Sequence, residues 1–254
     1  MKRAFVIAIA VLGVAGVYPL DLPAQQREID HRLEYEACLA LADENPTEAY
    51  RSGLAWFKAG GGLPARHCVA VSLIGLGDHE AAATRFETLA RELAESQVDL
   101  RAEMLGHAGQ AWLLAGRPVR ASQVQAAAIA LRPADPTLLV DRAVSLMTAK
   151  RHAAAIVDLN QALAIAPDFV DAYLYRATAK RYSGDIGGAW IDVSDALSLE
   201  PGLPAALLER GILNQLDGDD LGAREDWLAV ISTAPRSTEA DAARARIEAM
   251  DVNQ

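Results

Sequence analysis

The chain has 254 residues, of which 52% are hydrophobic and 23% charged, so it holds enough apolar material for one large domain. Only 6% of the residues are aromatic while alanine is abundant, a composition that favours closely packed helices over sheets. The formal net charge of −10 argues against a nucleic-acid partner, because phosphate binding requires a basic face. The acidic residues are spread along the chain, which indicates a role in solubility more than an acidic recognition patch.

The first 24 residues have the pattern of a secretory signal peptide. Lys2 and Arg3 precede a nearly uninterrupted apolar run over residues 4–20, and the segment ends at the small residue Ala24. This run is shorter than the ~20 residues that comfortably span a bilayer. We expect residues 1–24 to be cleaved and the chain to be periplasmic, in a Gram-negative bacterium. The alternative is an uncleaved anchor in the inner membrane, with the chain facing the periplasm.

Cys38 and Cys68 are the only cysteines of the sequence. An even number of cysteines in an exported protein makes a disulfide the default expectation, with two free buried thiols as the alternative. Neither cysteine has a second ligand at Cys-x-x-Cys distance, so the pair does not fit a zinc site. Each cysteine falls in the first helix of its own predicted hairpin. A bridge would therefore join the first two hairpins, where the repeat pattern is weakest.

Two helical hairpins are predicted before the regular part of the sequence. Residues 25–62 form a degenerate N-terminal hairpin, in which Asn45 is a candidate N-cap and Pro46 occupies a first helical position. Residues 63–101 form a clearer unit of two helices that turn at Gly77.

From residue 102 onward the sequence repeats every 34 residues. The repeat is marked by proline, alanine and aspartate residues in a constant phase: Pro133, Pro167, Pro201 and Pro235; Ala155, Ala189 and Ala223; Asp158, Asp192 and Asp226. A period of this length predicts stacked helical hairpins, because one hairpin cannot bury its apolar faces alone. The predicted units are 102–135, 136–169, 170–203 and 204–237. Residues 238–254 are predicted to be a C-terminal capping helix and tail.

These markers resemble the tetratricopeptide-repeat superfamily. The family pattern has large residues at positions 4 and 24, small ones at 8, 20 and 27, glycine near 15 and proline at 32. Unit 170–203 matches it with Tyr173, Ala177, Gly184, Ala189, Val193, Ala196 and Pro201. Lys150 replaces the turn glycine in one unit, and Val230 replaces the late alanine in another. The resemblance is strong over residues 102–235, moderate over 63–101, and limited to periodicity before that. It implies an all-α, right-handed solenoid of stacked antiparallel helical hairpins.

Charged residues also recur with the period. The arginines at position 7 are Arg142, Arg176 and Arg210, and the aspartates at position 23 are Asp158, Asp192 and Asp226. Unit 102–135 has Ala108 and Val124 at these positions, so both partners are absent together. We therefore predict structural ion pairs between the two helices, within a unit or to its neighbour. The alternative is a row of arginines that binds a polyanion.

No catalytic motif is visible in the sequence. There is no His-Glu-x-x-His pair, no serine in a Gly-x-Ser-x-Gly elbow and no glycine-rich phosphate loop with its lysine. His67 and His107 could face the same side of neighbouring units, but two histidines without a carboxylate or cysteine ligand make a weak metal site. We predict no metal, no cofactor and no enzymatic activity.

The resemblance implies that the first helices of the hairpins line a concave face. The residues predicted to form a peptide-binding groove there are Val140, Val144, Met147, Leu174, Tyr175, Thr178, Arg181, Tyr182, Leu208, Ile212 and Gln215. An apolar groove with a few polar groups suits an extended or helical peptide. The alternative is that these residues mostly pack against adjacent helices. Some tetratricopeptide domains grip a C-terminal carboxylate with lysine and asparagine at these positions, and this chain has neither there.

The leading functional hypothesis is a non-catalytic protein–protein interaction scaffold of the cell envelope. It would bind a peptide segment of an envelope protein on its concave face, and would touch a membrane only through an uncleaved N-terminal segment. The alternative is a self-associating structural subunit of an envelope assembly. The sequence leaves the oligomeric state open.

Overall fold

The computed structural model describes residues 24–252, with side chains from residue 31 onward. The predicted signal peptide lies outside this range except for its last residue, Ala24, which begins the first helix. Cleavage and export therefore stay predictions. None of the described helices combines the length and apolar character that a bilayer-spanning segment needs.

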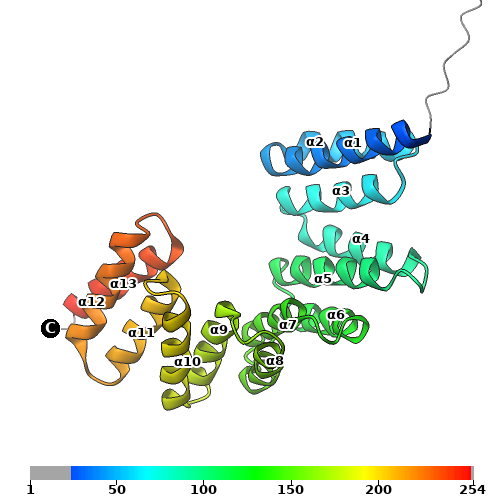
Figure 1. The fold of residues 1–254 in the computed structure, drawn as a ribbon. Helices are drawn as coiled ribbons and strands as arrows, with labels where there is room; N and C mark the ends of the chain where they lie inside the picture. Colours follow the sequence, from blue (N-terminus) through cyan, green and yellow to red (C-terminus); the bar gives the residue numbers. More distant parts are fainter. Residues whose placement is uncertain (1–23, 253–254) are drawn as a thin grey trace, which may run out of the picture.

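Thirteen α-helices and no strand make up the described part of the chain. The helices are α1 Ala24–Glu44, α2 Pro46–Lys58, α3 Gly62–Gly75, α4 His79–Glu92, α5 Val98–Leu114, α6 Pro118–Leu131, α7 Pro136–Thr148, α8 His152–Ile165, α9 Val170–Tyr182, α10 Ile186–Leu199, α11 Pro204–Leu216, α12 Asp220–Thr233 and α13 Thr238–Val252. Consecutive helices pack as antiparallel pairs, and the pairs follow one another along an arc with α1 and α13 at its two ends (Figure 1). The protein is thus an all-α solenoid of stacked hairpins.

Local sequence signals explain where the helices begin. Short aspartate and asparagine side chains precede several helices and accept hydrogen bonds from backbone N–H groups of the first turn; these caps are Asn45, Asp78, Asp135, Asp185 and Asp219. Such bonds satisfy donors that have no partner inside the helix. Proline occupies the first helical position of α2, α6, α7 and α11, where its missing N–H costs nothing.

The turn inside each repeat needs a backbone with positive φ. Gly116, Gly184 and Gly218 adopt φ values of 71°, 86° and 83° at equivalent positions. Lys150 occupies the same position in the α7–α8 turn and adopts a φ of 59°, the only non-glycine residue with positive φ in the described range. The repeat therefore imposes the left-handed turn even where the sequence lacks glycine.

The core of each hairpin is built from the repeated small and large residues. The alanines at position 20 are completely buried: Ala121, Ala155, Ala189 and Ala223. The larger residues one turn later on the same helices are also inaccessible to solvent: Gln125, Leu159, Val193 and Trp227. Successive hairpins share these clusters, so the apolar core is a continuous layer along the arc.

Small residues on the first helix match the size of the residue that they face. Gly109 faces Gln125, and a Cβ atom added to Gly109 would lie 2.4 Å from the Gln125 side chain. Gly211 faces Trp227 in the same way, also with a separation of 2.4 Å. The intervening units combine alanine with the smaller Leu159 or Val193. Each hairpin therefore has its own complementary pair of residues at one fixed interhelical spacing.

A disulfide closes the N-terminal end of the solenoid. Cys38 of α1 and Cys68 of α3 are joined, with their Cα atoms 6.2 Å apart, and both side chains are buried. The bond links the first helices of the first two hairpins. At the other end, α13 packs its small face, with Ala240 and Ala243 fully buried, against the cluster around Trp227.

Candidate functional site

The first helices of the hairpins line the inner side of the arc. α1 packs against α3, and α5, α7, α9 and α11 form a row in which each packs against the next. The second helices of successive hairpins have no comparable contact. A solenoid bends toward its more closely spaced row, so the odd-numbered helices form the concave face. We call this surface the inner face.

Three of the predicted groove residues pack in or against the hydrophobic core. Val140 is 6% exposed and belongs to the cluster between α6 and α9, and Ile212 is 8% exposed within the C-terminal cluster. Met147 is half-buried and packs on the same cluster as Val140. These side chains offer little surface to a ligand, because neighbouring helices already cover them.

The middle of the inner face is more open. On α9, Tyr175 is 37% exposed, and Leu174 and Thr178 are half-buried. Burial, followed by the nearby Asp171 and Asp141 carboxylates, raises the pKa of Tyr175 above its usual value. The Tyr175 hydroxyl therefore stays protonated at neutral pH and is available as a hydrogen-bond donor.

The remaining groove residues differ in how free they are. Val144 and Gln215 are half-buried. Leu208 packs against the C-terminal cluster and its carbonyl accepts a hydrogen bond from the Trp227 indole.

Arg181 and Tyr182 are engaged with other side chains. Arg181 donates from Nε and Nη2 to Glu209 of α11, at 2.6 and 3.2 Å, in a largely buried bidentate pair. Its guanidinium also lies over the Tyr182 ring, 4.5 Å from the centroid. Tyr182 stacks in turn on His152, with the ring centroids 5.1 Å apart. Arg181 thus joins α9 to α11, while Tyr182 as a residue remains 62% exposed.

The repeated arginines and aspartates form ion pairs within the three units that carry them. Asp158, Asp192 and Asp226 are buried, and each accepts two or more hydrogen bonds from the arginine 16 residues before it. Asp192 is completely buried and also pairs with Lys180 at 2.9 Å. Each pair links the first and second helices of one hairpin, so the arginines are not free to form a polyanion site.

A row of polar side chains crosses the N-terminal half of the inner face. Gln110 of α5 donates to Asp141 of α7 at 3.0 Å. Burial raises the pKa of Asp141, and the hydrogen bond from Gln110 partly offsets this effect. Farther toward the N-terminus, the Tyr35 hydroxyl of α1 hydrogen-bonds to Nδ1 of His67 on α3, at 3.0 Å.

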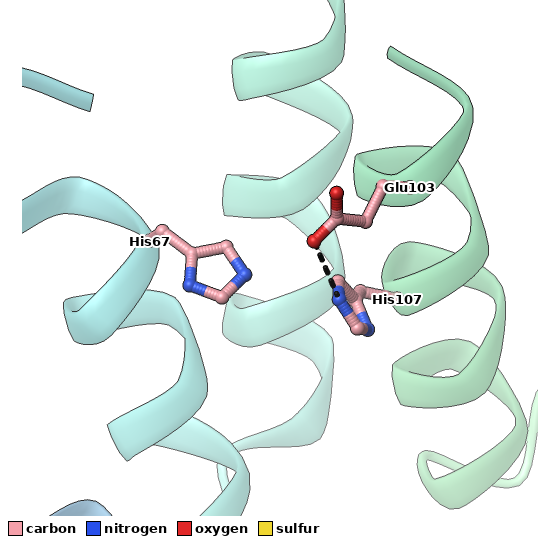
Figure 2. A group of neighbouring side chains, drawn as sticks. All are labelled: His67, Glu103 and His107. Carbon is pink, nitrogen blue, oxygen red and sulfur yellow. Dashed lines mark ion pairs between the residues drawn. The ribbon is translucent and has the colours of Figure 1, made fainter. Parts of the chain in front are cut away.

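His67, Glu103 and His107 come together next to this tyrosine. Figure 2 shows His67 of α3 pointing toward Glu103 and His107, which lie one turn apart on α5. One side-chain atom from each residue lies within 4.8 Å of the others, and His107 Nε2 is 3.7 Å from Glu103 Oε1. Phe86 of α4 packs against both imidazole rings, at 5.5 and 5.3 Å between centroids.

The cluster contains a ligand type that the two histidines were expected to lack. His67 and His107 do lie on neighbouring first helices, but a carboxylate accompanies them. The signal was present in the sequence, since Glu103 precedes His107 by four residues and such pairs share one helix face. Tyr35 carried no such signal, because only the packing of α1 on α3 brings it to His67.

Comparison with known proteins bears on the fold. No family model and no curated protein sequence matches the chain. Among solved structures, MamA residues 41–end from Desulfovibrio magneticus RS-1 superposes with a TM-score of 0.57 at 21% identity, covering 68% of this chain and 95% of that one. A further crystal structure of MamA gives a TM-score of 0.55 at 17% identity, covering 65% and 93%.

A longer superposition comes from the crystal structure of the APC/C hetero-tetramer Cut9–Hcn1. It covers 87% of this chain and 44% of the other, with a TM-score of 0.63 at 17% identity. At these identities the likeness concerns the fold alone. The MamA and Cut9–Hcn1 structures superpose on the stacked hairpins described above. The chain is therefore similar in fold to these solenoids, and this likeness agrees with the resemblance of its 34-residue markers to tetratricopeptide repeats.

Proposed function

We propose that this protein is a non-catalytic interaction scaffold that binds a peptide segment of a partner protein on its inner face. The observation that carries the proposal is the open stretch of α9, where Leu174, Tyr175 and Thr178 remain partly accessible. The Tyr175 ring and the half-buried Leu174 side chain provide apolar contact, and the Tyr175 hydroxyl provides a hydrogen-bond donor, a combination suited to peptide recognition.

The rigidity of the surrounding helices supports the same proposal. Ion pairs fix α9 to α10 through Arg176 and Asp192, and to α11 through Arg181 and Glu209. A surface held by such pairs is already organised before a ligand arrives, which lowers the entropic cost of binding.

We place this scaffold in the cell envelope, in the periplasm. Two features support the location: the signal-peptide pattern of residues 1–24 and the disulfide between Cys38 and Cys68, a bond that persists in oxidising compartments. The partner would then be a protein of the envelope.

A pull-down from the native envelope fraction tests the proposal. Partners captured by the wild-type protein are identified by mass spectrometry, and the affinity of a purified candidate is then measured with Leu174→Asp/Tyr175→Asp. Charge at these two positions removes apolar contact from the centre of the surface, so we expect affinity to fall by about tenfold or more.

The matched control is Val157→Asp on α8, a second helix, where the side chain is 63% exposed and no binding surface is proposed. This variant should bind as the wild type does. Full binding by a folded Leu174→Asp/Tyr175→Asp variant would show that the partner binds elsewhere. Light scattering separates the alternative function, because a self-associating subunit would remain oligomeric on dilution.

A further inference from the structure

The backbone row of first helices is interrupted between α3 and α5. From α5 onward, each first helix packs directly on the next one along the inner face. Between α3 and α5 there is no comparable contact, and α5 packs mainly on α4 and α6. Residues 93–97 connect α4 to α5 and lie between the α3–α4 and α5–α6 hairpins in the sequence. Side chains of His67, Glu103 and His107 meet at this junction, and Phe86 packs against both imidazole rings.

The buried nitrogen of His67 has no hydrogen-bond partner among the described residues. His67 is only 7% exposed, and its Nε2 atom is inaccessible to solvent and unpaired. An unsatisfied buried polar atom is costly, and few occur in native proteins. This nitrogen lies on the side of the ring that faces Glu103 and His107, as Figure 2 shows.

The other ring nitrogen of His67 is already held. Nδ1 lies 3.0 Å from the Tyr35 hydroxyl. With the proton on Nδ1 donated to the phenol oxygen, Nε2 carries a lone pair directed at the cluster. A metal-binding histidine commonly has such a partner on its second nitrogen, which fixes both the tautomer and the ring orientation.

From this geometry we infer that His67, Glu103 and His107 bind one divalent transition-metal cation, such as Zn²⁺. Two imidazole nitrogens and one carboxylate oxygen are ligands that this class of ion accepts. Metal bonds of about 2.0–2.2 Å place the ligand atoms of a tetrahedral site roughly 3.3–3.5 Å apart. The separation of 3.7 Å between Glu103 and His107 is close to this value, and the remaining pairs, within 4.8 Å, close by small side-chain rotations.

The surroundings favour a cation in this position. His67 is buried against Phe86, and burial favours the neutral form of the ring, which is the form that coordinates a metal. Asp141 lies close enough to interact electrostatically with His107, and the chain as a whole has a net charge of −10. The side chains of Glu103 and His107 are 48% and 37% exposed, which leaves an entry path and room for water as a fourth ligand.

Isothermal titration calorimetry of the purified full-length protein with zinc chloride tests the site, after treatment with EDTA and desalting. We expect one Zn²⁺ per chain. Glu103→Gln and His107→Asn should each weaken binding by about tenfold or more, because each removes one ligand. Tyr35→Phe should weaken it by about tenfold through the loss of the bond that orients His67.

His31→Asn is the matched control. His31 and Glu34 form a similar histidine–glutamate pair on α1, at 3.8 Å, but the pair belongs to no such three-ligand cluster among the described residues. Its loss should leave the zinc affinity unchanged. Equal weakening by His31→Asn and His107→Asn would overturn the assignment, as would the absence of binding by the wild type.

Nuclear magnetic resonance of the wild-type histidine rings gives a readout that needs no substitution. Zn²⁺ should shift the ring resonances of His67 and His107 together, at one equivalent, and leave those of His152 in place. Resonances of His67 that stay unchanged at saturating zinc would contradict the proposal.

Discussion

At the scale of single residues, the hairpins depend on pairs of side chains whose sizes compensate. Gly211 lies against the fully buried Trp227, and Ala143 occupies the equivalent position opposite the smaller Leu159. The helix pairs keep a common spacing because a larger residue on one helix is matched by a smaller one on the other. The repeat pattern accepts any small residue at this position, so it does not show that the size of this residue depends on the residue opposite.

This size matching predicts that Gly211→Ala changes the free energy of unfolding in opposite directions in two backgrounds. Gly211→Ala should destabilise the wild-type protein by about 1–2 kcal/mol, because the new methyl group meets the Trp227 ring and overpacking outweighs the gain in helix propensity. In a Trp227→Leu background the same change should stabilise by about 0.5–1 kcal/mol, since the clash is gone and the propensity gain remains. Urea unfolding followed by circular dichroism measures both effects. The same sign in both backgrounds would refute the size-matching explanation.

The repeat position of a residue on the inner face does not by itself predict whether its side chain is exposed. Val140 and Ile212 occupy positions that the family pattern assigns to a groove, yet neighbouring helices bury them. Arg181 is taken up by Glu209, which lies 28 residues away on the next first helix. The degree of exposure at these positions depends on how far apart the first helices lie, and the repeat phase does not specify that distance.

At the scale of helices, the ion pairs are internal links between the two halves of a hairpin. Arg142 on α7 donates to Asp158 on α8 through two hydrogen bonds, at 2.7 and 2.5 Å. The preceding unit joins its helices at the same positions with Ala108 and Val124, which are both buried. One hairpin architecture therefore tolerates either a charged or an apolar link.

This natural comparison predicts the outcome of a double-mutant cycle. Asp158→Val alone should destabilise the protein by about 3 kcal/mol, because it leaves a largely buried arginine without its partner. Arg142→Ala/Asp158→Val reproduces the apolar link of the preceding unit and should lie within about 1 kcal/mol of the wild type. Chemical unfolding of the four proteins measures the coupling. A double variant as unstable as the sum of the two single variants would exclude it.

At the scale of the whole molecule, the solenoid is stabilised by contacts between neighbours. Each hairpin packs on the one before and the one after it, and the described helices at the two ends of the arc do not touch. Stability in such an architecture is distributed locally, so a perturbation should decay within one or two hairpins. The disulfide and α13 protect the two ends, where a hairpin has a neighbour on one side only.

The disulfide gives a direct test of this locality. Removing the link between residues 30 positions apart, as in Cys38→Ser/Cys68→Ser, should destabilise the N-terminal hairpins by about 3–4 kcal/mol, through the restored freedom of the unfolded segment. Hydrogen exchange should become faster in α1–α4 and stay unchanged in α9–α13. The C-terminal helices serve as the internal control, and uniform acceleration along the chain would contradict a locally stabilised solenoid.

The sequence by itself determined the architecture. A 34-residue period with glycine at the turn, proline after the second helix and small residues at the helix contacts leaves a stacked hairpin solenoid as the physically consistent solution. The period also predicts that Arg142, Arg176 and Arg210 pair with aspartates, because both partners are present or absent together in a unit. The structure decided that each pair lies within one unit, 16 residues apart.

Only the tertiary structure decided which residues of different units meet. Tyr35, His67, Glu103 and His107 come from the first helices of three hairpins. Tyr35 reaches His67 through the packing of α1 on α3, and His67 meets Glu103 and His107 at the junction of α3 and α5. The accessibility of Tyr175 on α9 and the burial of Val140 on α7 likewise depend on the distances between neighbouring first helices. A repeat specifies contacts within one unit and to the next. Where the packing between two units departs from the repeat, it sets the distance between their first helices and so decides which side chains meet or remain accessible.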